Sequence, residues 1–245
     1  MMKTKRSEII NEIKDTSPII PQRNKIKSLL SIHQRQLNEK QQQFLELAMD
    51  KSTKIVFVSG PAGTSKTYMA IYAALTLLNQ RRVSDLIYIR SAVESSEAKL
   101  GFLPGEADDK MAPYLAPLVD KLTELLPKGD IDTLRKEDRI SSVPVGFLRG
   151  LNWNAKVIIS DEAQNMTFKE LFTLITRTGE FSKMFILGDP EQSDINGKSG
   201  FLKMLSYFDD DESKANGIQV FKFTDDDIVR SGLVQFIIKK VRKTS

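Results

Sequence analysis

The stretch between residues 54 and 80 limits the fold of this chain more than any other. Residues 54–59 form a β-branched and aromatic run that predicts a strand, and residues 68–80 have the apolar spacing of an amphipathic helix. The segment that joins them, Gly60-Pro-Ala-Gly-Thr-Ser-Lys-Thr67, matches the phosphate-loop pattern G-x-x-x-x-G-K-S/T at every fixed position except the second glycine, which is Ser65. This order predicts an anion site, because the N–H groups and the dipole of the helix N-terminus face the loop. A turn that carries Lys and Thr by chance is the alternative, and the flanking strand and helix speak against it.

Each part of such a loop has a role in binding ATP. Backbone N–H groups surround the β-phosphate, a lysine reaches the β and γ oxygens, and a hydroxyl binds Mg²⁺. Gly60, Lys66 and Thr67 are the residue types that these roles require. The backbone before the lysine must approach the phosphate closely, so Ser65 must point its side chain away or the loop must relax, and Gly63 keeps some of the freedom. The residues expected to contact the nucleotide are Gly60, Pro61, Ala62, Gly63, Thr64, Ser65, Lys66, Thr67 and Tyr68.

Strands and helices alternate on both sides of the loop. Short apolar runs predict further strands at residues 86–89, 157–159 and 184–187, and helical spacing marks residues 37–49, 111–126 and 167–176. Alternation of this kind predicts an α/β fold with three layers, in which helices cover both faces of a mostly parallel sheet.

Two acidic residues, Asp161 and Glu162, follow the strand at residues 157–159. In open α/β sheets the ligand lies at the carboxyl ends of the strands, so both carboxylates should face the phosphate loop. Asp161 is then expected to hold Mg²⁺ together with Thr67, while Glu162 orients and deprotonates the attacking water. Hydrolysis is therefore the expected reaction. The structural alternative makes Asp161 a helix N-cap and Glu162 a solvated neighbour.

Another strand ends in polar groups, in the sequence Ile186-Leu-Gly-Asp-Pro-Glu-Gln192. Asp189 and Gln192 could reach the γ-phosphate and report whether it is present. A Gly-Asp-Pro turn that merely leaves the strand is the alternative. The acidic run Asp209–Glu212 is most simply a solvated loop.

Composition narrows the classes of function further. The 245 residues contain no cysteine and one histidine, His33, so disulfides, thiolate metal sites and histidine metal clusters are not expected. The first fifteen residues contain no apolar run that resembles a signal peptide or a membrane span. We expect a cytoplasmic protein without a membrane partner. The net charge of +4 favours a polyanionic partner only weakly.

One domain accounts for most of the chain. Residues 1–35 are polar and charged, and Pro18 and Pro21 prevent one continuous helix there, which predicts an N-terminal polar or helical extension. Residues 36–245 are expected to form a single P-loop ATPase domain.

Several motifs together resemble a known family. Asp161-Glu-Ala-Gln164 with Gly188-Asp-Pro-Glu-Gln192 resembles the core of superfamily 1 helicases, and the wider set is similar to the PhoH family of P-loop ATPases. Between roughly residues 37 and 238 the motifs that carry this second resemblance are Leu100–Gly105, Lys110–Leu122, Asp161–Asn165, Thr176–Gly179, Gly188–Gln192 and Phe223–Arg230. The resemblance implies a RecA-like, superfamily 1-like fold and the minimal form of the ATPase that phages also encode. Ser65 departs from the family pattern, and so does Ser231, where the family often has histidine.

The helicase-like families carry a glutamine before the phosphate loop that reads adenine. Leu37-Asn-Glu-Lys-Gln41 resembles that motif, which makes Gln41 the candidate, although Gln42 and Gln43 leave the register open. An amide can pair with the N6 and N7 edge of adenine.

Superfamily 1 helicases close ATP between two RecA-like domains, and this chain has sequence for one. The resemblance therefore implies a homo-oligomer in which a neighbouring subunit supplies the second wall, and a closed head-to-tail contact makes a ring, here a hexamer. Arg177 and Arg230 are the candidates for an arginine acting across the interface, and each could instead be a surface ion-pair partner. Arg90 could contact a nucleic-acid phosphate or the interface.

Three functions remain open at this stage. The leading hypothesis is an ATP-driven remodelling enzyme or helicase that acts on single-stranded nucleic acid, RNA rather than DNA, through backbone contacts. The second is a nucleotide-gated assembly or protein-interaction module that hydrolyses ATP slowly and unwinds nothing. A small-molecule kinase comes third, because Glu162 favours water as the acceptor.

Overall fold

The computed structural model describes residues 26–33, 35–91, 107–195 and 197–242. Pro18, Pro21 and the motif Leu100–Gly105 lie outside these residues. Residues 26–33 pack against the main domain, because Leu30 exchanges two backbone-to-amide hydrogen bonds with Asn79 at 2.8 and 2.9 Å. The division of the chain at residue 36 stays a prediction.

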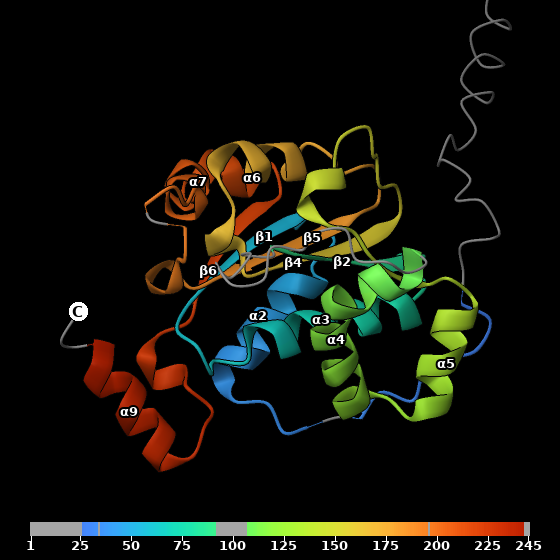
Figure 1. The fold of residues 1–245 in the computed structure, drawn as a ribbon, viewed down its shortest axis with the longest axis horizontal. Coiled ribbons are helices and arrows are strands. Elements are labelled where there is room, and N and C mark those ends of the chain that lie inside the picture. Colours follow the sequence, from blue (N-terminus) through green and yellow to red (C-terminus); the bar gives the residue numbers. More distant parts are fainter. Residues whose placement is uncertain (1–25, 34, 92–106, 196, 243–245) are drawn as a thin grey trace, which may run out of the picture.

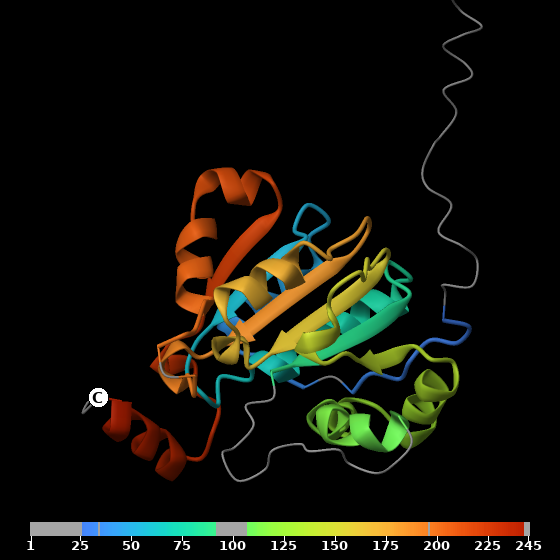
Figure 2. The ribbon, with the colours of Figure 1, turned by 45° about the horizontal axis from the view of Figure 1, so that its top comes forward.

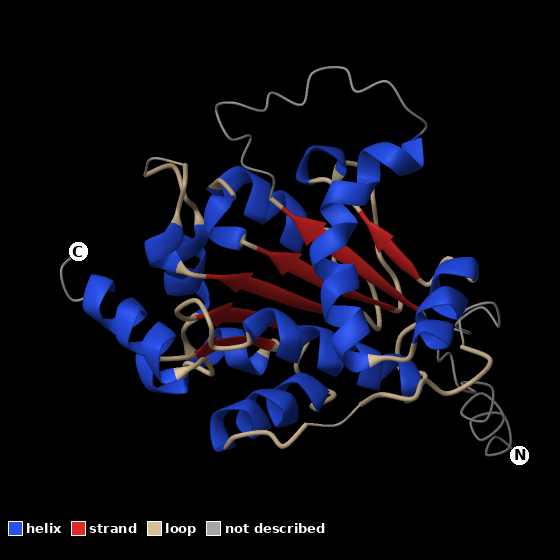
Figure 3. Ribbon diagram, turned by 60° about the horizontal axis from the view of Figure 1, so that its bottom comes forward, coloured by secondary structure: helices blue, strands red, loops and turns tan. Residues whose placement is uncertain are grey.

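A six-stranded parallel sheet forms the centre of the molecule (Figure 1). Its order is β3-β2-β4-β5-β1-β6, and the bounds are β1 Ile55–Ser59, β2 Asp85–Arg90, β3 Ile140–Ser142, β4 Lys156–Asp161, β5 Lys183–Gly188 and β6 Ile218–Lys222. Figure 3 shows the strand arrows pointing the same way, so all carboxyl ends share one edge of the sheet. This α/β fold confirms the expectation of a P-loop type architecture.

Strand order determines which polar strand ends meet. The phosphate loop follows β1, the acidic pair stands at the end of β4, and β5 lies between these two strands. Ser59 pairs in register with Gly188, so the loop and the segment after β5 begin side by side. β5 and the polar residues at its end therefore lie between the phosphate loop and the acidic pair.

Helices cover both faces of the sheet, and the strands are buried because each face carries a core (Figure 2). One face is covered by α2 Glu39–Met49, α3 Lys66–Asn79, α4 Ala107–Leu125 and α5 Lys128–Lys136. The other is covered by α6 Phe168–Ile175 and α7 Phe201–Phe208, followed by the short α8 Asp211–Ala215. Along β1, Val56 and Val58 face the first core and Phe57 faces the second, which is the period-2 pattern of a strand. The last helix, α9 Gly232–Arg242, stands away from both layers.

The four strands predicted from apolar runs are all present, whereas β3 and β6 were not predicted, although Ile218, Val220 and Phe221 give β6 a β-branched and aromatic signal. β3 is three residues long and contains two serines, and β6 is an edge strand whose residues are half-buried or exposed. The acidic run is exposed as expected, but it is not simply a loop. Asp210 is the N-cap of α8, where its carboxylate accepts the Ser213 N–H at 2.7 Å.

Within the described ranges, no helix combines the length and the apolar character that crossing a membrane requires.

Candidate active site

A cavity of about 410 Å³ opens at the carboxyl edge of the sheet. The ends of β4 and β5, the phosphate loop, α4, the start of α2 with the segment before it, and the segment before α9 contribute to its walls. Among the residues predicted from sequence, those that line it are Gln41, Ala62, Gly63, Ser65, Lys66, Thr67, Tyr68, Asp161, Glu162, Asp189, Gln192 and Arg230. Gly60, Pro61 and Thr64 belong to the same loop but lie beneath this surface, where all three are buried.

The phosphate loop has a backbone conformation that explains its glycine pattern. A side chain at Gly60 would place its Cβ 2.6 Å from the Cβ of Phe223, so only glycine fits between β1 and β6. Ser65 has φ 66° and ψ 24°, in the left-handed region where the loop pattern normally has glycine. For a non-glycine residue this conformation costs on the order of 1–2 kcal/mol. The loop thus keeps its usual shape at Ser65 and tolerates strain.

Internal hydrogen bonds hold the loop closed. The Lys66 ammonium donates to the carbonyl oxygens of Gly60 at 2.7 Å and Pro61 at 2.9 Å. The Thr64 hydroxyl donates to the same Pro61 oxygen at 2.9 Å. From the end of β5, the buried carboxylate of Asp189 accepts the Ala62 N–H at 3.1 Å. Lys66 is therefore positioned over the loop, and Asp189 ties the loop to β5.

Asp161 connects β4 to the first turn of α3. Both of its carboxylate oxygens lie 3.1 Å from the Thr67 hydroxyl, which donates to them, and Oδ2 also accepts the Tyr88 phenol at 2.7 Å. Burial, reinforced by the Asp161 charge, raises the pKa of Tyr88 above its usual range. The phenol therefore stays a proton donor and fixes the carboxylate rotamer. A hydroxyl and a carboxylate oxygen side by side fit Mg²⁺, which takes hard oxygen ligands and retains several waters.

Glu162 stands at the rim of the cavity in a left-handed backbone conformation with φ 54°. Its Oε2 accepts the Gln164 side-chain amide at 2.7 Å, and its Oε1 lies 3.8 Å from the Arg90 guanidinium. The side chains of Arg90 and Glu162 are 35% and 38% exposed, so water screens this ion pair. The carboxylate is thereby oriented from two sides while it still faces solvent.

Gln164 joins the two acidic segments. While its amide nitrogen donates to Glu162, its Oε1 accepts the Asp189 N–H at 3.1 Å. Its side chain is 1% exposed, so its amide is held in place by packing as well as by hydrogen bonds. The ends of β4 and β5 are thus coupled through one buried side chain.

Among the three consecutive glutamines at the start of α2, only Gln41 faces the cavity. Its Oε1 accepts the Asn38 N–H at 3.1 Å as part of a capping box, and the residue is buried. Gln42 and Gln43 are exposed and hydrogen bond to glutamates of the same helix. Helix packing therefore selects Gln41 for any contact with a base.

The two candidate arginines lie at different ends of the molecule. Arg230 is beside the loop of its own chain, where its Cγ would be 3.0 Å from a Cβ on Gly63. Arg177 follows α6 and donates to the carbonyl oxygens of Thr173 at 3.2 Å and Leu151 at 3.4 Å. It lies near the amino ends of β4 and β5, and so at the edge of the sheet opposite the cavity.

Comparison with known proteins agrees with this geometry. The model of a family described as PhoH-like protein matches residues 33–242. The chain belongs to the PhoH family. Similar curated proteins include the PhoH-like protein of Mycobacterium tuberculosis (strain H37Rv), 38% identical over 193 residues, and that of Bacillus subtilis (strain 168), 37% identical over 202 residues. Protein PhoH of Escherichia coli (strain K12) is 31% identical over 226 residues.

These alignments cover most of this chain and a smaller part of each relative. They include 78%, 80% and 91% of the chain, but 53%, 61% and 58% of the three relatives in the same order. The chain therefore spans between half and two thirds of their lengths. Membership of the PhoH family and the geometry of the loop together make it a P-loop ATPase-like protein.

Three residues at or beside this cavity make contacts that the sequence does not predict. Tyr88 looks like an ordinary apolar strand residue, and only the pairing of β2 with β4 brings it to Asp161. Gln164 lies inside a recognised motif, but its bonds to Glu162 and Asp189 depend on the strand order. Arg35 also lies at the cavity, with its guanidinium carbon 5.3 Å from the Tyr68 ring centroid. No local pattern marks the contacts of any of these three residues.

We predict that Tyr88→Phe weakens the Mg²⁺-dependent part of nucleotide binding by about tenfold, since loss of a residue that orients a metal ligand typically has that effect. Titration of a fluorescent ATP analogue at a series of Mg²⁺ concentrations measures it. Tyr72→Phe on α3 is the matched control and should leave the titration unchanged. An unaltered Mg²⁺ dependence in Tyr88→Phe would show that the phenol does not orient Asp161.

Proposed function

We propose that this chain hydrolyses ATP, with Glu162 as the residue that orients and deprotonates water. The main support is the position of its carboxylate, which is held by Gln164 at 2.7 Å at the solvent-facing rim of the cavity and directly follows Asp161. A base for hydrolysis must be fixed in direction and still reach water, and this carboxylate meets both requirements. A merely solvated glutamate would not need a buried amide to orient it.

The other residues divide the binding of ATP among them. The loop N–H groups and Lys66 hold the β- and γ-phosphates, and Gln41 reads the adenine edge. Thr67 and Asp161 would hold Mg²⁺, which neutralises phosphate charge that develops during transfer. Gln192 lines the cavity near the γ-phosphate position, and Asp189 transmits its state to the loop through Ala62.

A neighbouring subunit completes the site in this proposal. Arg230 already lies at the cavity of its own chain, so it acts there, and Arg177 is the better candidate for an arginine that acts across the interface. Arg177 lies at the opposite edge of the sheet, which a head-to-tail contact would bring to the next cavity. The assembly is then a closed homo-oligomeric ring, for which we propose a hexamer.

We propose that ATP hydrolysis drives a motor, meaning an enzyme that remodels or unwinds nucleic acid. Its proposed substrate is single-stranded nucleic acid, RNA in preference to DNA. Support comes from the motifs that resemble helicases and from the net charge of +4. The second candidate is a nucleotide-gated assembly module with slow hydrolysis. The strained backbone of Ser65, inside the loop, favours it, because slow turnover suits a switch better than a motor.

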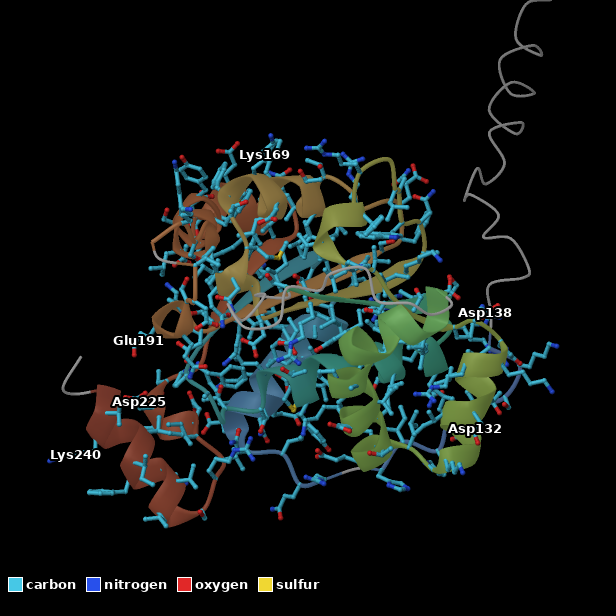
Figure 4. All side chains as sticks on the ribbon, viewed as in Figure 1. Asp132, Asp138, Lys169, Glu191, Asp225 and Lys240 are labelled. Carbon is cyan, nitrogen blue, oxygen red and sulfur yellow. The ribbon has the colours of Figure 1, made fainter. Side chains whose placement is uncertain are left out.

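We predict that Lys66→Ala and Glu162→Gln separate binding from catalysis. Lys66→Ala loses charge-assisted bonds worth about 1.5–3 kcal/mol, so nucleotide affinity should fall by a factor on the order of 10–100. Glu162→Gln should bind ATP like the wild type, but its rate of phosphate release should be lower by a factor of about 100 or more. Lys169→Ala, at an exposed lysine of α6 that does not line the cavity, is the control for Lys66→Ala (Figure 4). Normal phosphate release by Glu162→Gln would refute the assigned role.

A titration with nucleic acid distinguishes the motor from the second candidate, the nucleotide-gated assembly module, which acts as a switch. We predict that single-stranded RNA raises the rate of phosphate release several-fold at low salt, and that this effect weakens as salt increases. A parallel assay measures strand separation of a tailed RNA duplex by wild type and Glu162→Gln. Stimulation together with Glu162-dependent unwinding supports the motor. No response to RNA or DNA, with ring formation that follows ATP, supports the switch.

A further inference from the structure

Helix α9 exposes a broad apolar face. Val234, Ile237 and Val241 are spaced i, i+3 and i+7 and share one side of the helix, with Leu233 and Phe236 beside them. Leu233 is 70% exposed, Phe236 64% and Val241 61%. An amphipathic helix is stabilised mainly by burying such a face, which for α9 is solvent-exposed in the isolated chain.

The segment that precedes α9 is hydrogen bonded to the phosphate loop. The Gly63 carbonyl accepts the Val229 N–H at 2.9 Å, and the Gln235 amide donates to the carbonyl oxygens of Ile228 and Arg230 at 3.1 and 2.9 Å. The segment that leads into α9 therefore has a definite position against the cavity. A partner that covers the first turn of α9 would therefore lie close to the cavity.

A second exposed apolar surface lies on α6 and α7, the helices that cover the face of the sheet opposite α2–α5. We call it the α6–α7 patch and define it by Phe168, Phe172, Leu202 and Tyr207. The rings of Phe168 and Tyr207 meet edge to face at 5.8 Å, and Phe172 lies one helical turn after Phe168. Phe172 is 55% exposed and Tyr207 52%. Figures 1 and 2 show α9 apart from α6 and α7.

At one end of each surface the charges are opposite in sign. The sequence of α9 ends in Lys239, Lys240, Val241 and Arg242 and contains no acidic residue. The α6–α7 patch adjoins the exposed acidic run that ends α7 and begins α8. In that run Asp209 and Asp211 pair with lysines of their own chain, whereas Glu212 forms no ion pair with any residue that the structure describes. The α6–α7 patch itself carries the Lys203 ammonium, which lies 5.0 Å from the centroid of the Phe168 ring and 5.8 Å from that of Tyr207, so a docked helix must displace it.

We propose that α9 of one chain docks on the α6–α7 patch of a second copy, with the basic end of α9 toward Asp209–Glu212. The two surfaces differ, so the contact is head-to-tail and repeats from copy to copy. The inference deepens the proposed ring, on which it rests, by assigning the surfaces that form it. It also places the next subunit beside the cavity, because α9 starts two residues after Arg230.

Light scattering on the full chain with ATP analogue and Mg²⁺ tests the contact. The wild type should have the mass of several 27.7 kDa chains, while Phe236→Glu and Phe172→Glu should each be monomers. An equimolar mixture of these two variants retains one intact α9 and one intact patch that can meet. It should therefore form a one-to-one dimer and nothing larger. Phe147→Glu, at an exposed phenylalanine outside both surfaces, is the control and should assemble like wild type.

Several results would overturn the contact. They are a monomeric wild type, an unchanged mass for Phe236→Glu, an unchanged mass for Phe172→Glu, or a mixture that stays monomeric. Thermal unfolding of each variant tests its fold, and Tyr207→Glu replaces Phe172→Glu if the latter unfolds at lower temperature. Phosphate release by the wild type is measured in parallel. A ring that assembles through these surfaces but releases no phosphate would refute the ATPase and leave the contact standing.

Discussion

The hydrogen bond from the Thr67 hydroxyl to Asp161 joins the two halves on which the site depends. Thr67 opens the helix after β1 and Asp161 closes β4, with β5 between these strands. The contact forms because the parallel strands end at one edge and because Tyr88 holds the carboxylate toward α3. A phosphate loop without this acid would bind an anion but would lack the oxygen pair that suits Mg²⁺.

The same edge explains how information about the nucleotide could travel. Asp189 holds the loop through Ala62, and Gln164 joins Asp189 to Glu162. A change at the loop therefore reaches the proposed base through three hydrogen bonds and two buried residues, Asp189 and Gln164. Ser65 adds backbone strain inside this arrangement.

Local patterns predicted the parts of this molecule that depend on neighbours in sequence. The apolar run before Gly60 and the acids after residue 159 each identify a strand and the chemistry at its end. What they omit depends on strand order or on surfaces. Tyr88 becomes a site residue only because β2 pairs with β4, and Gln41 differs from Gln42 only by which side of α2 is buried. β3 is a short edge strand without an apolar run, and β6 mixes apolar and polar residues as a half-buried edge strand does. The exposed face of α9 has a role only through the proposed contact with a second chain.

The central claim is that a neighbouring chain completes the ATP site, and mixing two inactive variants tests it most directly. Glu162→Gln and Arg177→Ala are combined as monomers before nucleotide is added, and phosphate release is measured once light scattering shows mixed assemblies. Each variant alone should be inactive, but in a random mixture about a quarter of the interfaces join an intact Glu162 to an intact Arg177. The account predicts recovery of up to about that fraction of wild-type activity. Mixed assemblies that release no more phosphate than either variant alone would contradict it.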